Sequence, residues 1–211
     1  MSDLAFDALL CDLDNVIRFY DLGEVNRQEQ AAGLPSGTTM EIAFAPERDL
    51  PLLLGRISRA QWAASIADAL ATKVPAQQAA ALASAFAHAP SRADRQVVEL
   101  IRRVRRSVPV VLVTNATVWL DDDLAQLGLT DLADHVVNSS RVHIAKPDAE
   151  IYKIAAEHAG VPAHRCAFVD DSQTNVDAAR RAGMTAVLYR DISDLRHLVA
   201  PIMDEVDPSL V

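Results

Sequence analysis

Two aspartates, Asp12 and Asp14, stand one residue apart at the end of an apolar run that begins at Ala8. Residues at positions i and i+2 of an extended chain point to the same side, so a strand would deliver both carboxylates to one place. Two like charges this close repel, and a cation or a shared proton must compensate them. The pair therefore predicts a reaction centre, with a strand end running into a solvated polar turn as the structural alternative.

Three further polar groups end apolar runs. Thr114 and Asn115 follow a run of valine and leucine, and they supply a hydroxyl and an amide that can hydrogen-bond an anionic oxygen. Lys146 precedes a proline, which keeps the lysine out of a helix. Asp170 and Asp171 form a second acid pair. Taken singly, each group has an ordinary alternative as a helix cap or an exposed amine, but together they predict one site with complementary charges.

The elements that must position these groups alternate between strand and helix patterns. This alternation favours parallel pairing through crossover helices, so we expect an α/β fold with a parallel sheet flanked by helices. Gly160 and Gly183 stand where C-terminal helix caps belong. The predicted strands cover residues 8–13, 108–114, 135–138, 165–170 and 184–189, and the predicted helices cover 92–105, 118–127, 149–159, 173–182 and 193–198.

Residues 18–90 break this alternation, because they contain alanine-rich helical stretches and no convincing strand. Ligands of parallel sheets bind outside the carboxyl ends of the strands, so an insertion directly after the first strand can lie over the site as a cap. We therefore predict a catalytic core of residues 1–17 and 91–211 with a small helical cap of 18–90. Within this cap we interpret Trp62 as a core residue.

Composition and charge exclude several classes of protein. Hydrophobic residues make up 50% of the 211-residue chain and charged residues 23%, which is the profile of a soluble globular protein. The net charge of -9 argues against a nucleic-acid partner, because phosphate backbones are bound by clustered lysine and arginine. We interpret the basic segment Arg102–Arg106 as a solvated helix face. No apolar run reaches the ~18 residues that span a membrane, and Met1–Phe6 lacks the features of a signal peptide, so we expect a cytoplasmic protein with no membrane partner. A homodimer is left open.

Cys11 and Cys166 are the only cysteines. If the strands carrying Asp12 and Asp170 are neighbours with their acids level, the cysteines are offset by three residues, or ~10 Å along the strands. This exceeds the limit of ~7 Å between the Cα atoms of a disulfide, so we expect two reduced thiols in the core.

The four motifs, in the order in which they occur along the chain, resemble those of the haloacid dehalogenase superfamily of hydrolases. The helical insertion after the first motif resembles the cap of the subfamily I type. The resemblance runs from Asp7 to about Tyr189, outside the insertion. It implies a Rossmann-like core, with Asp12 as the nucleophile and Asp14 as the general acid and base. It also implies that Thr114 and Lys146 bind the transferring phosphoryl group.

The same resemblance implies a magnesium ion held by Asp12, the backbone carbonyl of Asp14, and the pair Asp170 and Asp171. Chemically this is reasonable, because Mg²⁺ prefers oxygen ligands and can neutralise an anion that attacks another anion. Backbone N–H groups of Leu13 and Asn115 would hold phosphoryl oxygens.

Asn15 and Arg18 are two further candidate positions near the first motif. Where the family commonly has glycine this chain has Asn15, which is the residue next best suited to a turn with positive φ. Arg18 is one of a few candidates for contacting the substrate. We list Asn15 and Arg18, with Leu13 and Asn115, as predicted substrate-binding residues.

These motifs favour a magnesium-dependent phosphatase that acts on a small phosphorylated metabolite through an aspartyl-phosphate on Asp12. Asp14 is the distinguishing residue, because a phosphoryl leaving group needs an acid whereas dehalogenases of the superfamily lack one at this position. A phosphomutase is the main alternative, since the same intermediate can be passed to a sugar hydroxyl. A 2-haloacid dehalogenase and a non-catalytic binding module are further alternatives.

Overall fold

The computed structural model describes residues 5–206, with side chains up to Met203. The prediction that Met1–Phe6 lacks the features of a signal peptide concerns residues of which the first four lie outside the described residues. The chain forms two compact units. The first combines the residues up to Phe19 with those from Ala93 onward, and the second is Tyr20–Arg92.

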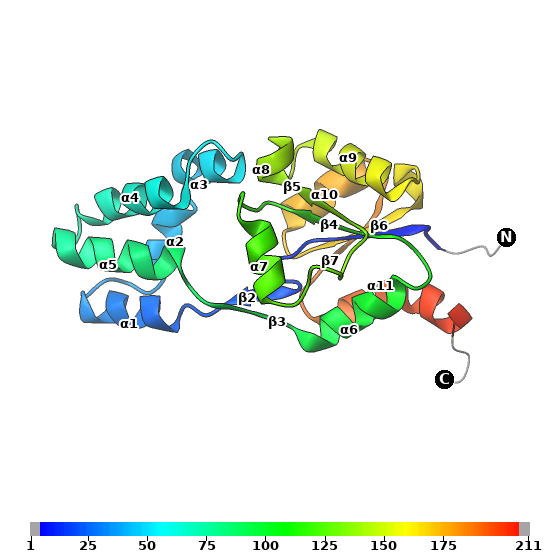
Figure 1. Ribbon diagram of the computed structural model, residues 1–211, viewed down its shortest axis with the longest axis horizontal. Helices are drawn as coiled ribbons and strands as arrows, with labels where there is room; N and C mark the ends of the chain where they lie inside the picture. The colour runs from blue at the N-terminus through cyan, green and yellow to red at the C-terminus, as the bar shows by residue number, and fades with distance from the viewer. Residues whose placement is uncertain (1–4, 207–211) are drawn as a thin grey trace. The chain divides into compact units, whose positions relative to one another are not determined.

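The first unit is built on a sheet of five parallel strands in the order β5-β4-β1-β6-β7 (Figure 1). This arrangement confirms the predicted Rossmann-like α/β fold. Each observed strand lies within a predicted strand or matches its bounds. A strand that helices cover on both faces is buried throughout, so it appears in the sequence as a continuous apolar run. The strands are β1 (Ala8–Cys11), β4 (Val110–Thr114), β5 (His135–Asn138), β6 (Cys166–Asp170) and β7 (Thr185–Leu188).

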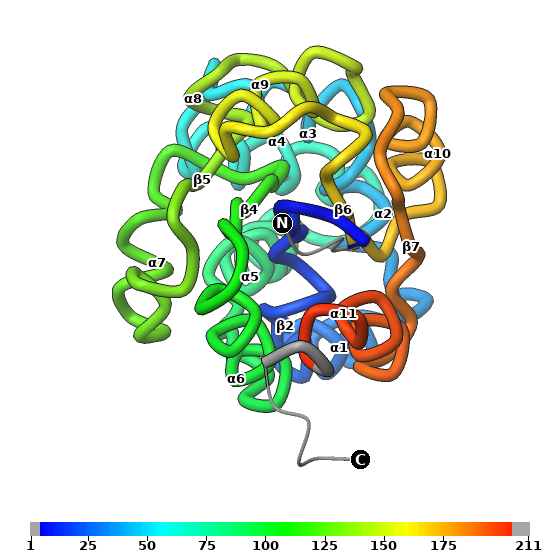
Figure 2. The backbone as a smooth tube through the Cα atoms, turned by 90° about the vertical axis from the view of Figure 1, so that its right-hand side faces the viewer, coloured from blue at the N-terminus to red at the C-terminus, as the bar shows by residue number. Residues whose placement is uncertain are grey.

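Alternate residues of each strand enter two separate cores, one on each face of the sheet. Leu9 and Cys11 of β1 face one core, while Ala8 and Leu10 face the other. The two sets of helices lie on opposite sides of the sheet (Figure 2). The first core is covered by α6 (Arg95–Val104), α7 (Leu120–Gln126) and α11 (Ile192–Val206), and the second by α9 (Ala149–Ala159) and α10 (Gln173–Arg181), with the short α8 (Ser139–Val142) and η1 (Ala163–Arg165) between strands.

Helix boundaries in this unit follow from local capping. The Asp94 carboxylate accepts hydrogen bonds from the first backbone N–H groups of α6, and the Asp148 carboxylate does the same for α9. Gly160 ends α9 with a φ of 71°, and Gly183 has a φ of 92° after α10. Both glycines therefore have the left-handed conformation that the sequence predicts for C-terminal caps.

The second unit is helical. Ser58 and Gln61 form a capping box at the start of α4 (Arg59–Leu70). Trp62 is buried, and its indole N–H donates to the carbonyl of Ala43 at 3.3 Å. The Trp62 ring lies 5.8 Å from that of Phe86, so Trp62 is a core residue of this unit, as predicted. The helices are α1 (Gly23–Ala31), α2 (Thr38–Ala43), α3 (Pro46–Leu53), α4 (Arg59–Leu70) and α5 (Ala76–Ala87).

One short strand corrects the expectation that residues 18–90 contain none. β2 (Arg18–Tyr20) pairs with β3 (Ser91–Ala93) in a two-stranded sheet where the chain passes between the units. Three residues are too few to show the alternation of polar and apolar residues that identifies a strand in sequence. The helices α1 to α3 were not predicted individually.

The register of β1 and β6 places the cysteines as predicted. Ala8 pairs with Cys166 and Cys11 pairs with Val169, so the thiols are three residues out of step. Both cysteines are buried and free. The same register places Asp12 level with Asp170, which is the alignment that the site requires.

The basic segment at the end of α6 makes surface ion pairs, Arg102 with Asp131 at 3.2 Å and Arg105 with Asp134 at 2.9 Å. These contacts agree with its interpretation as a solvated helix face. Among residues 5–206, no helix combines the length and apolar character needed to cross a bilayer.

Candidate active site

The predicted motifs meet at the carboxyl ends of three adjacent strands. Asp12 follows β1, Thr114 ends β4 and Asp170 ends β6, and the sheet order places β1 between the other two. All three side chains are buried. Parallel strands present their carboxyl ends at one edge, so residues far apart in sequence share one small volume.

Lys146 joins two of these acids. Its Nζ lies 2.7 Å from Oδ1 of Asp12 and 2.6 Å from Oδ2 of Asp170, and its side chain is 1% exposed. Burial alone would lower the pKa of Lys146, but the two carboxylates raise it above its ordinary value. The ammonium therefore stays protonated at the centre of the site.

The side chain of Asn115 holds the backbone of Lys146 from both sides. Its Oδ1 accepts from the Lys146 N–H at 2.7 Å, and its Nδ2 donates to the Lys146 carbonyl at 3.0 Å. This pairing ties the end of β4 to the lysine loop. The Asn115 side chain thus has a positioning role that the sequence did not indicate.

The surroundings of Asp12 raise the pKa of its carboxyl. Burial raises its pKa, and the nearby Asp170 and Asp14 raise it further, while Lys146 opposes this shift. Oδ1 of Asp12 accepts hydrogen bonds from Lys146 and from the Leu13 N–H, the latter at 2.7 Å. The Leu13 N–H therefore contacts the predicted nucleophile, and its contact with a phosphoryl oxygen stays a prediction.

Three acids lie close enough to share one cation. Oxygens of Asp12, Asp170 and Asp171 all lie within 4.8 Å of one another. Lys146 supplies one positive charge against these carboxylates, and burial raises the pKa of Asp171. An all-oxygen cluster with excess negative charge fits a hard divalent cation such as Mg²⁺. The Asp14 side chain is not part of this cluster, so its predicted part through the backbone carbonyl stays a prediction.

Several residues hold Asp170, which ends β6, and Asp171, which follows it. The Asp170 carboxylate accepts from the Ser172 N–H at 2.8 Å and from Nδ2 of Asn175 at 3.0 Å. Asn15, with a φ of 60°, donates from Nδ2 to Oδ2 of Asp171 at 2.9 Å. The positive φ agrees with the expectation for Asn15. Its side chain contacts a predicted metal ligand, and its role in binding the substrate stays a prediction.

The Thr114 hydroxyl is buried without a partner. Oγ1 makes no hydrogen bond among the described residues, although the residue is fully buried. A buried hydroxyl without a partner costs about 1–3 kcal/mol, and a ligand oxygen that accepted its hydrogen bond would recover this cost. Its place at the end of β4 beside β1 suits an anionic oxygen of a ligand.

We expect Thr114→Val to separate stability from activity. Valine has nearly the same shape and removes the unpartnered hydroxyl, so the free energy of unfolding should rise by about 1 kcal/mol in urea titrations. Turnover of a phosphate ester should fall by about 10²-fold, because a donor to the phosphoryl oxygens is lost. Thr39→Val is the matched control, since Thr39 in α2 also buries an unpartnered hydroxyl. The control should gain stability and keep full turnover; an equal loss in both variants would contradict the assignment.

Arg18 is placed differently from its predicted role. It belongs to the first unit and is 3% exposed, with Nε 2.6 Å and Nη2 3.0 Å from the two carboxylate oxygens of Asp14. Its Nη1 lies 2.9 Å from Oδ2 of Asp123. The guanidinium therefore contacts two carboxylates, and its contact with the substrate stays a prediction. Asp123 lies in the first turn of α7 and was not among the predicted site residues.

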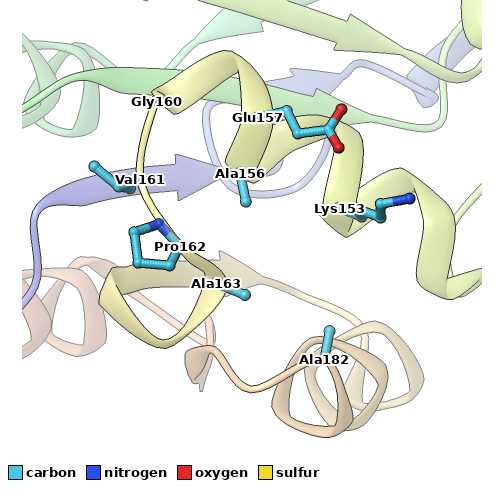
Figure 3. A pocket seen from close by; sticks show the side chains of 8 residues that line it. All are labelled: Lys153, Ala156, Glu157, Gly160, Val161, Pro162, Ala163 and Ala182. Carbon is cyan, nitrogen blue, oxygen red and sulfur yellow. The ribbon is translucent and has the colours of Figure 1, made fainter.

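A surface pocket of about 440 Å³ lies elsewhere on the first unit (Figure 3). Lys153 and Glu157 of α9 supply its charged side chains. None of the predicted site residues lines it, so the site is defined by the strand ends and not by this pocket. Its remaining lining residues are Ala156, Gly160, Val161, Pro162, Ala163 and Ala182.

The fold and the four converging motifs define a class of hydrolase, and a family comparison agrees. The chain belongs to the family of haloacid dehalogenase-like hydrolases, whose sequence model matches residues 6–183. The match includes all of the residues that form the acid cluster and the lysine between them.

Named relatives cover different activities. Bifunctional epoxide hydrolase 2 of Rattus norvegicus is 27% identical over 209 residues, which is 89% of this chain and 37% of the rat protein. Phosphatase MT3486 of Mycobacterium tuberculosis (strain CDC 1551 / Oshkosh) is 38% identical over 86 residues, or 40% of each chain. Fructose-1-phosphate phosphatase YqaB of Escherichia coli (strain K12) is 38% identical over 67 residues, 32% of this chain and 36% of that protein. This chain thus matches less than half the length of each of these relatives.

Solved structures share the fold. The HAD family enzyme BT-2542 of Bacteroides thetaiotaomicron, in complex with magnesium and inorganic phosphate, has a TM-score of 0.70 at 22% identity, over 92% of this chain and 98% of that one. An L-2-haloacid dehalogenase from Xanthobacter autotrophicus, with chloropropionic acid covalently bound, has a TM-score of 0.61 at 17% identity, over 95% and 88%. At these identities the likeness establishes the fold alone.

Proposed function

We propose that this protein is a magnesium-dependent phosphatase that hydrolyses a small phosphorylated metabolite through an aspartyl-phosphate on Asp12. One observation carries the proposal: the Lys146 ammonium joins Asp12 to Asp170 at 2.7 and 2.6 Å, within a cluster of three acids. A lysine and a cation-binding acid cluster beside a carboxylate suit the attack of one anion on another.

Asp12, Asp170 and Asp171 would hold Mg²⁺, with the backbone carbonyl of Asp14 as a further ligand. When bound, Mg²⁺ supplies positive charge that neutralises the transferring phosphoryl group. The donor set fits this ion, because carboxylate oxygens are its usual protein ligands and the cluster carries excess negative charge. The structure of BT-2542 was solved with magnesium and inorganic phosphate, which supports the same choice of ion.

In the first step Asp12 attacks phosphorus. Its Oδ1 is held by Lys146 and the Leu13 N–H, while Oδ2 makes no hydrogen bond within the described residues. A new bond forms between a carboxylate oxygen and phosphorus as the bond from phosphorus to the leaving oxygen breaks. Lys146 and the Thr114 hydroxyl stabilise the charge on the phosphoryl oxygens. Asp14 gives its proton to the leaving oxygen.

In the second step water replaces Asp12. Asp14, now a carboxylate, accepts a proton from water as the water oxygen bonds to phosphorus. The bond between Asp12 and phosphorus breaks, which releases inorganic phosphate and restores both acids. Asp14 also separates this proposal from dehalogenation, because cleavage of a carbon–halogen bond needs no proton donor to the leaving group.

The relatives named as phosphatases support the same reaction class. We also propose that the unit Tyr20–Arg92 serves as a cap that contributes contacts to the substrate. The chain enters this unit directly after the strand that carries Asp12 and Asp14, and ligands of parallel sheets bind at the carboxyl ends of strands.

Removal of Mg²⁺ tests the proposal directly. Treatment with EDTA should abolish release of phosphate from a panel of phosphorylated metabolites and from an aryl phosphate, and added Mg²⁺ should restore it. Mg²⁺ should also raise the thermal unfolding temperature, because a ligand that binds only the folded state stabilises it. Asp171→Asn should weaken this thermal shift.

Product analysis distinguishes a mutase, which yields an isomerised sugar phosphate. Chloride release from a 2-haloacid in the presence of EDTA would overturn the proposal.

A further inference from the structure

The segment that follows β4 is held by side chains at the end of the neighbouring edge strand, β5. The two strands pair so that Asn138 lies beside Thr114, and Ser139 follows directly as the first residue of α8. The Ser139 hydroxyl accepts a hydrogen bond from the Ala116 N–H at 3.1 Å and donates one to the Ala116 carbonyl at 3.2 Å. One side chain thus contacts both backbone polar groups of Ala116.

The residue before Ala116 contacts the lysine of the site in the same way. The Asn115 side chain accepts from the Lys146 N–H at 2.7 Å and donates to the Lys146 carbonyl at 3.0 Å. The Lys146 ammonium in turn lies 2.7 and 2.6 Å from two carboxylates of the site. Two contacts of the same form therefore connect the end of β5 to the lysine, first through Ala116 and then through Asn115.

Burial makes the hydroxyl of Ser139 hard to replace. Backbone groups beyond the end of a strand have left the sheet ladder, so they need other partners. Ser139 is 0% exposed and Ala116 is 3% exposed, so water has little access to these groups. Asn138 adds a second link to the same segment, because its Nδ2 donates to the Thr117 carbonyl at 2.8 Å.

We propose that Ser139 is a positioning residue for the lysine of the site. Through Ala116 it fixes the segment that carries Asn115, and through Asn115 it fixes the backbone of Lys146. This inference rests on the proposed phosphatase function. Such support matters to the reaction because a displacement of about 1 Å at a catalytic group can lower turnover by about 10²-fold.

Hydrogen exchange measured by NMR tests the connection independently of activity. In Ser139→Ala the Lys146 N–H should exchange about tenfold faster, because the Asn115 side chain holds it less firmly. The Leu9 N–H, which donates to the Pro109 carbonyl at 3.0 Å in the sheet, reports global unfolding. A general loss of stability would speed the exchange of both amides by the same factor, whereas the proposal predicts the larger effect at Lys146.

Turnover tests the consequence for the reaction. With saturating Mg²⁺, kcat for 4-nitrophenyl phosphate should fall by about tenfold in Ser139→Ala, because the ammonium is displaced and not removed. Ser139→Cys keeps a weaker hydrogen-bonding group, so its kcat should lie between those of Ser139→Ala and the wild-type protein. In an Asn115→Ala background, where the link to Lys146 is already lost, Ser139→Ala should change neither kcat nor the exchange of the Lys146 N–H any further.

Ser140→Ala is the matched control, because it removes a buried hydroxyl from the next residue. This hydroxyl donates to Oδ1 of Asn138 at 2.9 Å. The same Oδ1 also accepts from the Ser140 N–H at 3.0 Å, a contact that the variant retains. Ser140→Ala should therefore match the wild-type protein in kcat and in the exchange of the Lys146 N–H.

Each outcome decides between the alternatives. Faster exchange at Lys146 than at Leu9, with a loss of kcat that disappears in the Asn115→Ala background, supports the inference. Equal acceleration at both amides, or a loss of kcat that persists in full without the Asn115 side chain, overturns it and leaves the phosphatase proposal intact. A wild-type protein that releases no phosphate from any substrate in Mg²⁺ overturns the proposed function, while the exchange comparison still decides whether Ser139 positions Lys146.

Discussion

Asp12→Asn is expected to lower phosphatase turnover by about four orders of magnitude or more, because an amide cannot form the covalent intermediate. The substitution keeps the shape of the side chain and lets Lys146 retain its contact with Asp170 at 2.6 Å. The variant should therefore fold. Acid quenching during turnover should trap the phosphoryl group on a wild-type peptide that contains Asp12, and peptide mass spectrometry of the variant should find none.

Asp7→Asn is the control for this experiment. Asp7 stands before the opposite end of β1 and pairs with Arg165 at 2.7 Å, away from the acid cluster. Its loss should lower the free energy of unfolding slightly and leave turnover unchanged. Full turnover by Asp12→Asn, or a trapped phosphoryl group on another residue, would show that Asp12 is not the nucleophile.

Lys146→Met should have the second largest effect, and it should act on stability as well as on activity. Methionine has a similar unbranched shape, but it leaves the buried carboxylates of Asp12 and Asp170 without their ammonium. Breaking a buried ion pair on one side costs about 3–5 kcal/mol, and urea titration should show a loss of this size without metal. Turnover should fall by about 10³-fold, because charge stabilisation at the phosphoryl group is lost.

The effect of Mg²⁺ on the stability of Lys146→Met has a specific expected direction. If the three acids hold the ion, Mg²⁺ should restore more stability to Lys146→Met than to the wild-type protein, because the variant has less positive charge in the cluster. Lys153→Met is the control, since Lys153 is 63% exposed and its ammonium pairs with the surface residue Glu150 at 3.3 Å. It should change the free energy of unfolding by less than about 1 kcal/mol. A Lys146 variant as stable as this control would contradict the central place of the lysine.

Local patterns in the sequence account for most of the first unit. The predicted bounds of β5 and α9 match the structure, and β6 and α10 differ from prediction by one residue at one end. These elements carry their own signals, namely apolar runs, carboxylate caps and glycine ends. The chain order of the motifs also indicated the site, since strands joined by crossover helices bring their carboxyl ends to one edge.

Contacts between distant segments were not predictable in the same way. Arg18 and Asp123 are 105 residues apart, and Asn15 and Asp171 are 156 apart. Arg18 was expected to contact the substrate because an arginine near a catalytic motif has no local mark that distinguishes a ligand contact from an internal ion pair. Only the packing of α7 beside the β1 loop decides which acid it meets.

The sequence by itself determined the parallel sheet, the residues that could do chemistry and the strand ends on which they stand, because periodicity and spacing act over a few residues. The tertiary structure alone decided which atoms meet: Lys146 with both Asp12 and Asp170, Asn115 with the backbone of Lys146, and Arg18 with Asp14 and Asp123. Charge partners are chosen by three-dimensional proximity and burial, and these depend on how whole elements pack.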